Sequence, residues 1–343
     1  MTPSDPAPPW SFPAAQPPGP STNRHLGPLP ISGLFEVGAR ILRRHAPILL
    51  GVAILIQLPG ALLDAVAQQR LADSVRPLLV GLDTETPQIL APTASQSDLL
   101  LGTLGVVLLG MFVSMVLGAI AAAANATTVL RDYHAEPTSF GGILGQALRR
   151  ALPAIVASIL AALALLAAVA LTAALAIGAA VLLPTGGGEV GGLGVFLALV
   201  TGVGGALVAV TLLIRLSLAV IAAALEDIGP VTALRRSWHL TGGNAWRTFA
   251  VLAILAFVTA VAGSLVVQLL GVTITDTVGV QLGAADTLDA MFAAAVAVLF
   301  APVTIVMQTV LYLDLRVRRD AWDLPAPGED GDLTPGAANQ TPD

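Results

Sequence analysis

The stretch "LRRALPAIVASILAALALLAAVALTAALAIGAAVLL" (residues 148–183) decides the fold. No charged residue follows its two arginines, and alanine, leucine and valine fill most of the positions. About 20 such residues are enough for an α-helix to cross the hydrocarbon core of a bilayer. Lipid offers no partner to unpaired backbone groups, so a helix, which pairs them internally, is favoured there. The stretch therefore predicts a transmembrane helix.

The composition of the whole chain extends this prediction. The 343 residues are 55% hydrophobic and 11% charged, whereas a soluble domain carries roughly 25% charged residues. We therefore expect an all-α polytopic membrane bundle of six transmembrane helices with three interfacial amphipathic helices. The expected spans lie at about 47–67, 98–124, 151–183, 194–214, 246–271 and 288–313.

The two ends of the chain differ from this membrane domain, which we place at residues 31–323. Residues 1–30 hold ten prolines, and residues 324–343 are polar with an acidic bias. Such compositions are typical of disorder, so we expect two disordered cytoplasmic tails. The absence of cysteine excludes disulfides and thiolate sites. The net charge of −6 arises largely in loops and the C-terminal tail, and we expect no nucleic-acid partner.

Arginine supplies all sixteen basic residues, and its distribution predicts the orientation. Thirteen of the sixteen fall in one set of connections, two (Arg70 and Arg76) fall in the other, and Arg215 is the remaining one. Basic residues gather on the cytoplasmic side of membrane proteins. We therefore expect a multi-pass protein of the cell (inner or plasma) membrane with both termini in the cytoplasm.

A short motif recurs before three of the spans. It appears in "ARILRRHAPILLGVAIL" (39–55), "GQALRRALPAIVASIL" (145–160) and "TALRRSWHLTGGNAWRTFAVLAIL" (232–255). The first two copies share Leu-Arg-Arg-x-x-Pro followed by a span, and the third inserts a Thr-Gly-Gly-Asn turn. This repetition predicts three units, each with an interfacial helix, a span and a return span.

The helix before the first span illustrates the predicted interfacial geometry. Ser32 is a candidate N-cap, and Glu36 stands four residues before Arg40, the favourable order for an ion pair on a helix. Such a helix lies among the headgroups with its arginines near lipid phosphates. We therefore expect membrane lipids, above all anionic phospholipid, as partners. The candidate contacts are the paired arginines Arg43, Arg44, Arg149, Arg150, Arg235 and Arg236.

Arg215, in "LLIRLSLAVIAAALED", has two readings. About twenty helical residues separate it from the start of its span near Gly194, a length of about 30 Å. It could therefore anchor the helix at the headgroup boundary. The alternative is a buried charge that pairs with Glu226, Asp227 or an anionic headgroup.

Other polar and small residues give weaker signals. The four histidines lie in the predicted cytoplasmic segments without the spacing of a metal site or a catalytic triad. We therefore expect no catalytic, metal or cofactor site. Small residues recur every four positions in the second span, which predicts close packing within the bundle or a homodimer contact. These residues are Gly110, Ser114, Gly118 and Ala122.

Three segments together resemble a known group of proteins. These are "LPISGLFEVGARILRRHAPILL" (29–50), "ALEDIGPVTALRRSWHLTGGNAWRTFAVL" (224–252) and "LYLDLRVRRDAWDL" (311–324). Their order resembles uncharacterised actinobacterial six-helix proteins grouped with the membrane domain of glycerophosphoryl diester phosphodiesterases. The resemblance covers roughly residues 28–324. In some relatives it implies a soluble phosphodiesterase barrel that follows the membrane region and carries the chemistry.

That barrel is not expected in this sequence. Only thirty residues follow the last predicted span, and no histidine lies beyond His239. We therefore expect a non-enzymatic, lipid-contacting scaffold or accessory module, with a protein partner or homo-oligomer left open. The alternative is a transporter or channel for a small or lipid-like solute, with its path along Gln57, Thr211 and Thr304.

Overall fold

The computed structural model describes residues 29–79, 94–182, 192–278 and 282–320, and all regular structure in these ranges is helical. Six of its helical stretches are long and apolar enough to cross a membrane. The chain is therefore an all-α membrane protein, as predicted. Its elements are α1 (Ile31–Val52), η1 (Ala53–Gln57), α2 (Leu58–Leu79), α3 (Ala94–Tyr133), α4 (Phe140–Arg149), α5 (Ala151–Leu182), α6 (Gly192–Leu216), α7 (Ala219–Leu225), α8 (Pro230–Thr241), α9 (Ala245–Val278) and α10 (Leu282–Asp320).

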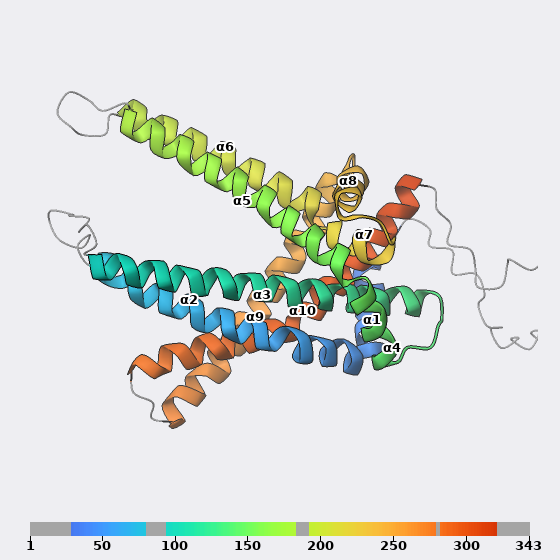
Figure 1. The fold of residues 1–343 in the computed structure, drawn as a ribbon. Helices are drawn as coiled ribbons and strands as arrows, with labels where there is room; N and C mark the ends of the chain where they lie inside the picture. The colour runs from blue at the N-terminus through green and yellow to red at the C-terminus, as the bar shows by residue number, and fades with distance from the viewer. Residues whose placement is uncertain (1–28, 80–93, 183–191, 279–281, 321–343) are drawn as a thin grey trace, which may run out of the picture.

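The long helices form three antiparallel hairpins, α2/α3, α5/α6 and α9/α10 (Figure 1). Each hairpin follows one shorter or kinked helical segment: α1, α4 or α8. The hairpins meet at the end where α1, α4, α7 and α8 lie and diverge from there, with α5/α6 standing apart from the other two. The tails expected to be disordered fall outside the described residues, except for Leu29 and Pro30.

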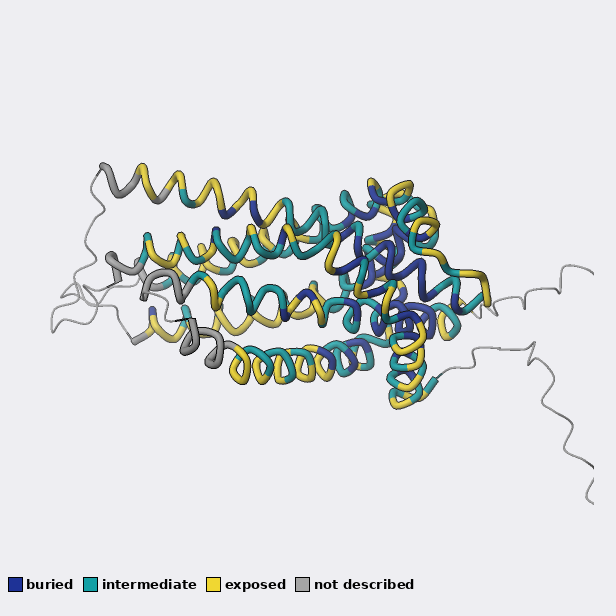
Figure 2. The backbone as a smooth tube through the Cα atoms, turned by 90° about the horizontal axis from the view of Figure 1, so that it is seen from below, coloured by how far each residue is buried: buried dark blue, intermediate teal, exposed yellow. Residues whose placement is uncertain are grey.

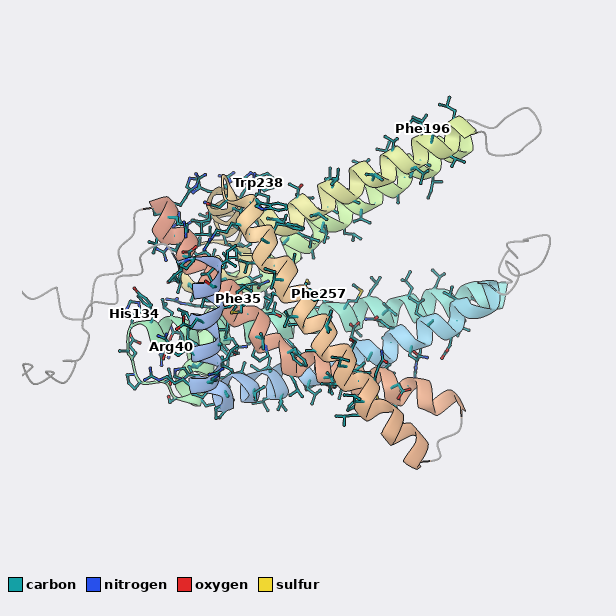
Figure 3. The ribbon with its side chains drawn as sticks, turned by 180° about the vertical axis from the view of Figure 1, so that it is seen from behind. Phe35, Arg40, His134, Phe196, Trp238 and Phe257 are labelled. Carbon is teal, nitrogen blue, oxygen red and sulfur yellow. The ribbon has the colours of Figure 1, made fainter. Side chains whose placement is uncertain are left out.

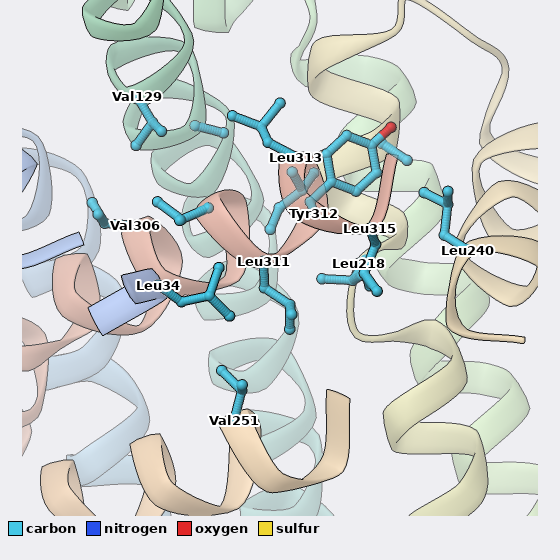
Figure 4. Close-up of a cluster of buried hydrophobic side chains, with 14 of the residues drawn as sticks. Leu34, Val129, Leu218, Leu240, Val251, Val306, Leu311, Tyr312, Leu313 and Leu315 are labelled. Carbon is cyan, nitrogen blue, oxygen red and sulfur yellow. The ribbon is translucent and has the colours of Figure 1, made fainter. Parts of the chain in front are cut away.

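The core of the protein lies at this shared end, where buried residues gather (Figure 2). Leu34, Val129, Leu240, Val251 and Leu311 come from five helices and pack into one cluster there (Figure 4). The short helix α7 is central to it, since most of its residues are buried. We refer to this region as the core end.

The diverging parts of the hairpins expose large apolar side chains instead. Leu166 on α5 is 63% exposed, Leu207 on α6 64%, and Leu269 on α9 71%. Lipid tails are as apolar as leucine, so there is no hydrophobic gain in burying such residues between membrane helices. These surfaces are the ones that a bilayer covers.

Small residues bring α2 and α3 together. A Cβ atom added to Gly60 would lie 3.3 Å from Cα of Ser114, and one added to Gly110 would lie 3.4 Å from Cα of Asp64. Packing within the bundle is thus confirmed for Gly110 and Ser114. A Cβ atom at Gly118 would meet no described atom within 4 Å.

Helix starts agree with the sequence in part. Helix α8 begins at Pro230 after Gly229, as predicted, and Glu36 pairs with Arg40 at 3.1 Å. The prediction of Ser32 as N-cap is wrong. The helix begins at Ile31, because the extended backbone of Pro30 precedes it and the Pro30 carbonyl already accepts from Leu34 N–H.

Helix α1 combines the predicted interfacial helix and the start of the first span. Its backbone leaves helical geometry at His45 (φ −112°, ψ 17°), two residues before Pro47. Proline lacks an N–H group, and its ring crowds the carbonyl four residues earlier, so a kink is expected there. Residues 31–44 and the span are therefore joined by a kink rather than by a loop.

Candidate functional site

The three Leu-Arg-Arg copies all lie at the core end, and the two arginines of each copy differ in their surroundings. The first arginine is exposed in every copy, and no described residue forms a hydrogen bond or ion pair with it. The second arginine of each copy binds the end of another element. We call the first set the outer arginines (Arg43, Arg149 and Arg235) and the second set the inner arginines (Arg44, Arg150 and Arg236).

In the first copy, Arg44 reaches the C-terminal end of α3. Its Nη1 lies 3.1 Å from Oδ1 of Asp132. The same oxygen lies 2.8 Å from Nε2 of the buried His45, whose Nδ1 is 3.3 Å from Oγ1 of Thr138. Neither His45 nor Asp132 could be singled out from the sequence, because nothing in the sequence places α3 beside the kink of α1.

In the second copy, Arg150 reaches the C-terminal end of α7. Its Nη1 donates to the carbonyl oxygens of Ala224 (3.0 Å) and Leu225 (3.2 Å). The last carbonyls of a helix have no partner within it, and its negative dipole end favours a cation. Arg150 therefore completes the short buried helix.

In the third copy, Arg236 joins two carboxylates. Its Nε lies 3.1 Å from Oε2 of Glu226, and its Nη2 pairs with Asp320. Burial alone lowers the pKa of Arg236, but the hydrogen bond with Asp320 and the charge of Glu226 more than offset this and raise it. Glu226 also accepts from Tyr312 Oη and lies 3.2 Å from Nε of Arg316. Among the described residues Glu226 is thus paired with Arg236 and Arg316 rather than with Arg215.

Arg215 lies beside α8, with its guanidinium 5.1 Å from the ring centroid of Trp238. Its Nη1 donates to the Trp238 carbonyl at 3.2 Å, and Nε of Arg319 donates to the His239 carbonyl at the same distance. Two arginines thus complete the C-terminal end of α8. Within the described ranges Arg215 forms no ion pair, so the pairing with Glu226 or Asp227 is not formed.

The Thr-Gly-Gly-Asn insertion makes room for these arginines. A Cβ atom at Gly242 would lie 2.8 Å from Nη2 of Arg319, and Gly243 adopts φ +77°, which favours glycine. The turn therefore ends α8 against α10 and lets α9 begin at Ala245. Figure 3 shows Arg40, His134 and Trp238 at this same end, far from Phe196 near the start of α6.

A second buried ion-pair cluster, which was not predicted from the sequence, joins α9, α10 and the backbone of Leu29. The Asp314 side chain is fully buried, and its oxygens accept from Leu29 N–H (2.8 Å), Arg247 Nη2 (3.0 Å) and Arg318 Nε (2.9 Å). Both guanidiniums also donate to the Leu29 carbonyl, at 2.6 and 2.7 Å. The four-residue spacing of Asp314 and Arg318 could have predicted their ion pair from the sequence. The sequence carries no such indication of the contact with Arg247.

A cavity of about 670 Å³ lies against α4. We call it the α4 cavity. It is lined by Arg131, Arg149, Arg150, Asp227, Gln146 and the glycines of α4. Two of the six candidate lipid contacts therefore share one concave site with Asp227.

Two residues of the alternative transport path line different cavities. Gln57 lines a cavity of about 690 Å³ between α2 and α10, together with Asp64 and Gln68. Thr304 lines another, of about 450 Å³, between α9 and α10. Thr211 is exposed and donates to the Leu207 carbonyl.

The part of the chain that the structure describes contains no group of three histidine, aspartate or glutamate residues arranged to hold a metal ion. Comparison with known proteins adds one match. A family model described as a domain of unknown function (DUF7847) matches residues 29–315. No curated protein and no solved structure matches the chain.

Proposed function

Because this chain belongs to the DUF7847 family, a domain of unknown function, we propose a function from the core end itself. The protein is a non-enzymatic membrane protein that binds anionic phospholipid headgroups through its outer arginines. It acts as a lipid-contacting scaffold or accessory module. The inner arginines hold the scaffold together, and the outer arginines face its lipid partners.

The observation that carries the proposal is this division between the arginines, which holds in all three copies. Inner arginines have carboxylate or carbonyl acceptors at 3.0–3.2 Å. Outer arginines are exposed, and the described residues offer them no acceptor. A basic residue near an anionic membrane surface contributes about 1 kcal/mol of binding. Three of them at one end give a useful but reversible attraction.

The same end is proposed to face the cytoplasm of the cell membrane. Basic residues favour that side, and the three Leu-Arg-Arg copies gather there. Leu29 binds Asp314 and Arg318, which brings the first described residue beside the last helix. This contact supports placing both termini on one side.

The likeness to glycerophosphoryl diester phosphodiesterase membrane domains supports the accessory reading. Any chemistry then belongs to a partner that this membrane domain holds at the lipid surface. Such a partner is a second protein or a further copy of the chain.

The experiment compares phospholipid that co-purifies with the protein in mild detergent. The variant Arg43→Gln/Arg235→Gln removes two outer arginines. The control Arg40→Gln/Arg70→Gln also removes two exposed charges, but Arg40 is paired with Glu36 and Arg70 lies on α2, away from the core end. We expect the first variant to lose anionic phospholipid and the control to keep it. Equal retention in the two proteins would count against the proposal.

A transporter is the second candidate, favoured by the polar lining of the cavity between α2 and α10. Asp64 accepts from Gln68 at 2.8 Å within it, and one Asp64 oxygen is buried without a hydrogen-bond partner among the described residues. Proteoliposomes loaded in turn with glycerol and larger polyols test it. Flux above that of empty liposomes, removed by Gln57→Leu, would favour transport over the scaffold.

A further inference from the structure

We propose that the α4 cavity binds one phosphate ester, with its phosphate at Arg131 and Arg149 and its alcohol portion at Asp227. The inference rests on the proposed function but makes a narrower claim. The other outer arginines attract anionic lipid by charge alone, whereas this cavity selects a single headgroup by shape and hydrogen bonding.

Helix α4 leaves open space on the side that faces the cavity. Gly141, Gly142 and Gly145 line the cavity. A Cβ atom at Gly141 or Gly145 would meet no described atom within 4 Å, so neither glycine is needed for helix packing. Glycine also weakens a helix relative to alanine. Gly141 and Gly145 therefore lower the stability of this ten-residue helix and leave open space beside it for a ligand.

Positive charge is in excess around that space. Arg131 donates to Oε1 of Gln146 at 2.9 Å and has Glu136 at 3.8 Å from its Nε. Arg150 donates only to neutral carbonyls, and Arg149 has no partner among the described residues. Three guanidiniums therefore line the cavity against two carboxylates, Glu136 and Asp227, which leaves an excess of positive charge. A guanidinium presents a planar fork of N–H donors that matches phosphate oxygens.

Asp227 indicates that the ligand is a phosphate ester rather than a bare phosphate. Its backbone adopts φ +54°, an uncommon conformation for a residue other than glycine. Asp227 lines the cavity, and its side chain pairs with no described residue. A carboxylate repels phosphate but accepts from a hydroxyl or an ammonium group. The matching ligand carries phosphate at one end and such a donor at the other.

Phosphate esters of this kind occur both in lipid headgroups and in soluble metabolites. Leu148 and Leu152, which flank Arg149 and Arg150, are 55% and 71% exposed. Apolar side chains so placed need a cover of lipid, which puts the cavity at the depth of the headgroups. This arrangement favours the lipid, and the experiment includes both sources.

The test uses the full chain in detergent and follows ligand binding by native mass spectrometry. The ligands are phosphatidylglycerol, phosphatidylcholine and soluble glycerol phosphate. Gly145→Leu fills the cavity without removing a charge. Gly105→Leu is the matched control, because Gly105 lies on α3 with open space around it and away from the cavity. Both changes replace a helical glycine with a better helix former, so both proteins are expected to fold.

We expect one phosphatidylglycerol to bind more tightly than phosphatidylcholine, whose headgroup has no hydroxyl or N–H donor. Gly145→Leu and Arg149→Gln lower that affinity on the order of tenfold, as loss of a charge-assisted contact does. Gly105→Leu leaves it unchanged, and Asp227→Gly, which removes the acceptor at a position whose positive φ glycine tolerates, reduces the preference over phosphatidylcholine. Binding of glycerol phosphate at millimolar concentration, with none of the phospholipids bound, would assign the site to a soluble ester.

The opposite results overturn the inference. They are unchanged binding in Gly145→Leu, or equal affinity of the wild type for the two phospholipids. Failure here differs from failure of the proposed function, because Gly145→Leu keeps every arginine. If only the selective cavity is absent, Gly145→Leu still retains anionic lipid and Arg43→Gln/Arg235→Gln still loses it.

Discussion

Nε of Arg236 lies 3.1 Å from a carboxylate oxygen of Glu226, in the segment that links α7 to α8. The adjacent Arg235 is exposed and has no described partner. One Leu-Arg-Arg copy thus contains a structural arginine and a free one. The contrast between these neighbours yields the first prediction.

Replacing Arg236 by glutamine destabilises the protein by about 3 kcal/mol, since it leaves the largely buried carboxylate of Glu226 with one fewer cation. The same change at Arg235 alters stability by less than about 0.5 kcal/mol, as most exposed substitutions do. Thermal unfolding of the two variants in one detergent measures the difference. Equal melting temperatures would remove the distinction between inner and outer arginines.

The Asp314 cluster predicts a local effect near the start of the membrane domain. Asp314→Asn keeps the shape of the side chain but leaves Arg247 and Arg318 buried or half-buried without their carboxylate. We expect the free energy of unfolding to fall by about 3–5 kcal/mol and the chain around Leu29 to detach from α10. Limited proteolysis would then cut near residue 29 faster than in the wild type. An unchanged cleavage pattern would show that the cluster does not hold this segment.

The turn between α8 and α9 predicts a backbone effect. Gly243 has φ +77°, so Gly243→Ala costs about 1–2 kcal/mol of stability. Gly229, the residue before α8, has an ordinary negative φ and open space around it. Gly229→Ala is therefore expected to have a smaller effect on the melting temperature. A larger effect at Gly229 than at Gly243 would contradict this account of the turn.

Local sequence predicted the long helices well, because each apolar span carries its own signal. The start of α8 at Pro230 and the Glu36–Arg40 pair also follow from neighbours in the sequence. Ser32 failed as an N-cap because Pro30, two residues earlier, already starts the helix.

The ion pairs of the core end could not be predicted from the sequence, for a physical reason. Arg247 and Asp314 are 67 residues apart, and Arg44 and Asp132 lie on α1 and α3, which are separated in the sequence by the whole of α2. Only the packing of α9 against α10 and of α3 against the kink at His45 brings such groups together. The sequence therefore identified six candidate arginines, and the packing divided them into two sets of three.

The central claim is that the outer arginines bind anionic phospholipid and do little else. The most direct test is the triple variant Arg43→Gln/Arg149→Gln/Arg235→Gln, purified in mild detergent and analysed for bound phospholipid and melting temperature. We predict wild-type stability together with loss of most co-purified anionic phospholipid. Wild-type retention of that lipid by the stably folded triple variant would contradict the account.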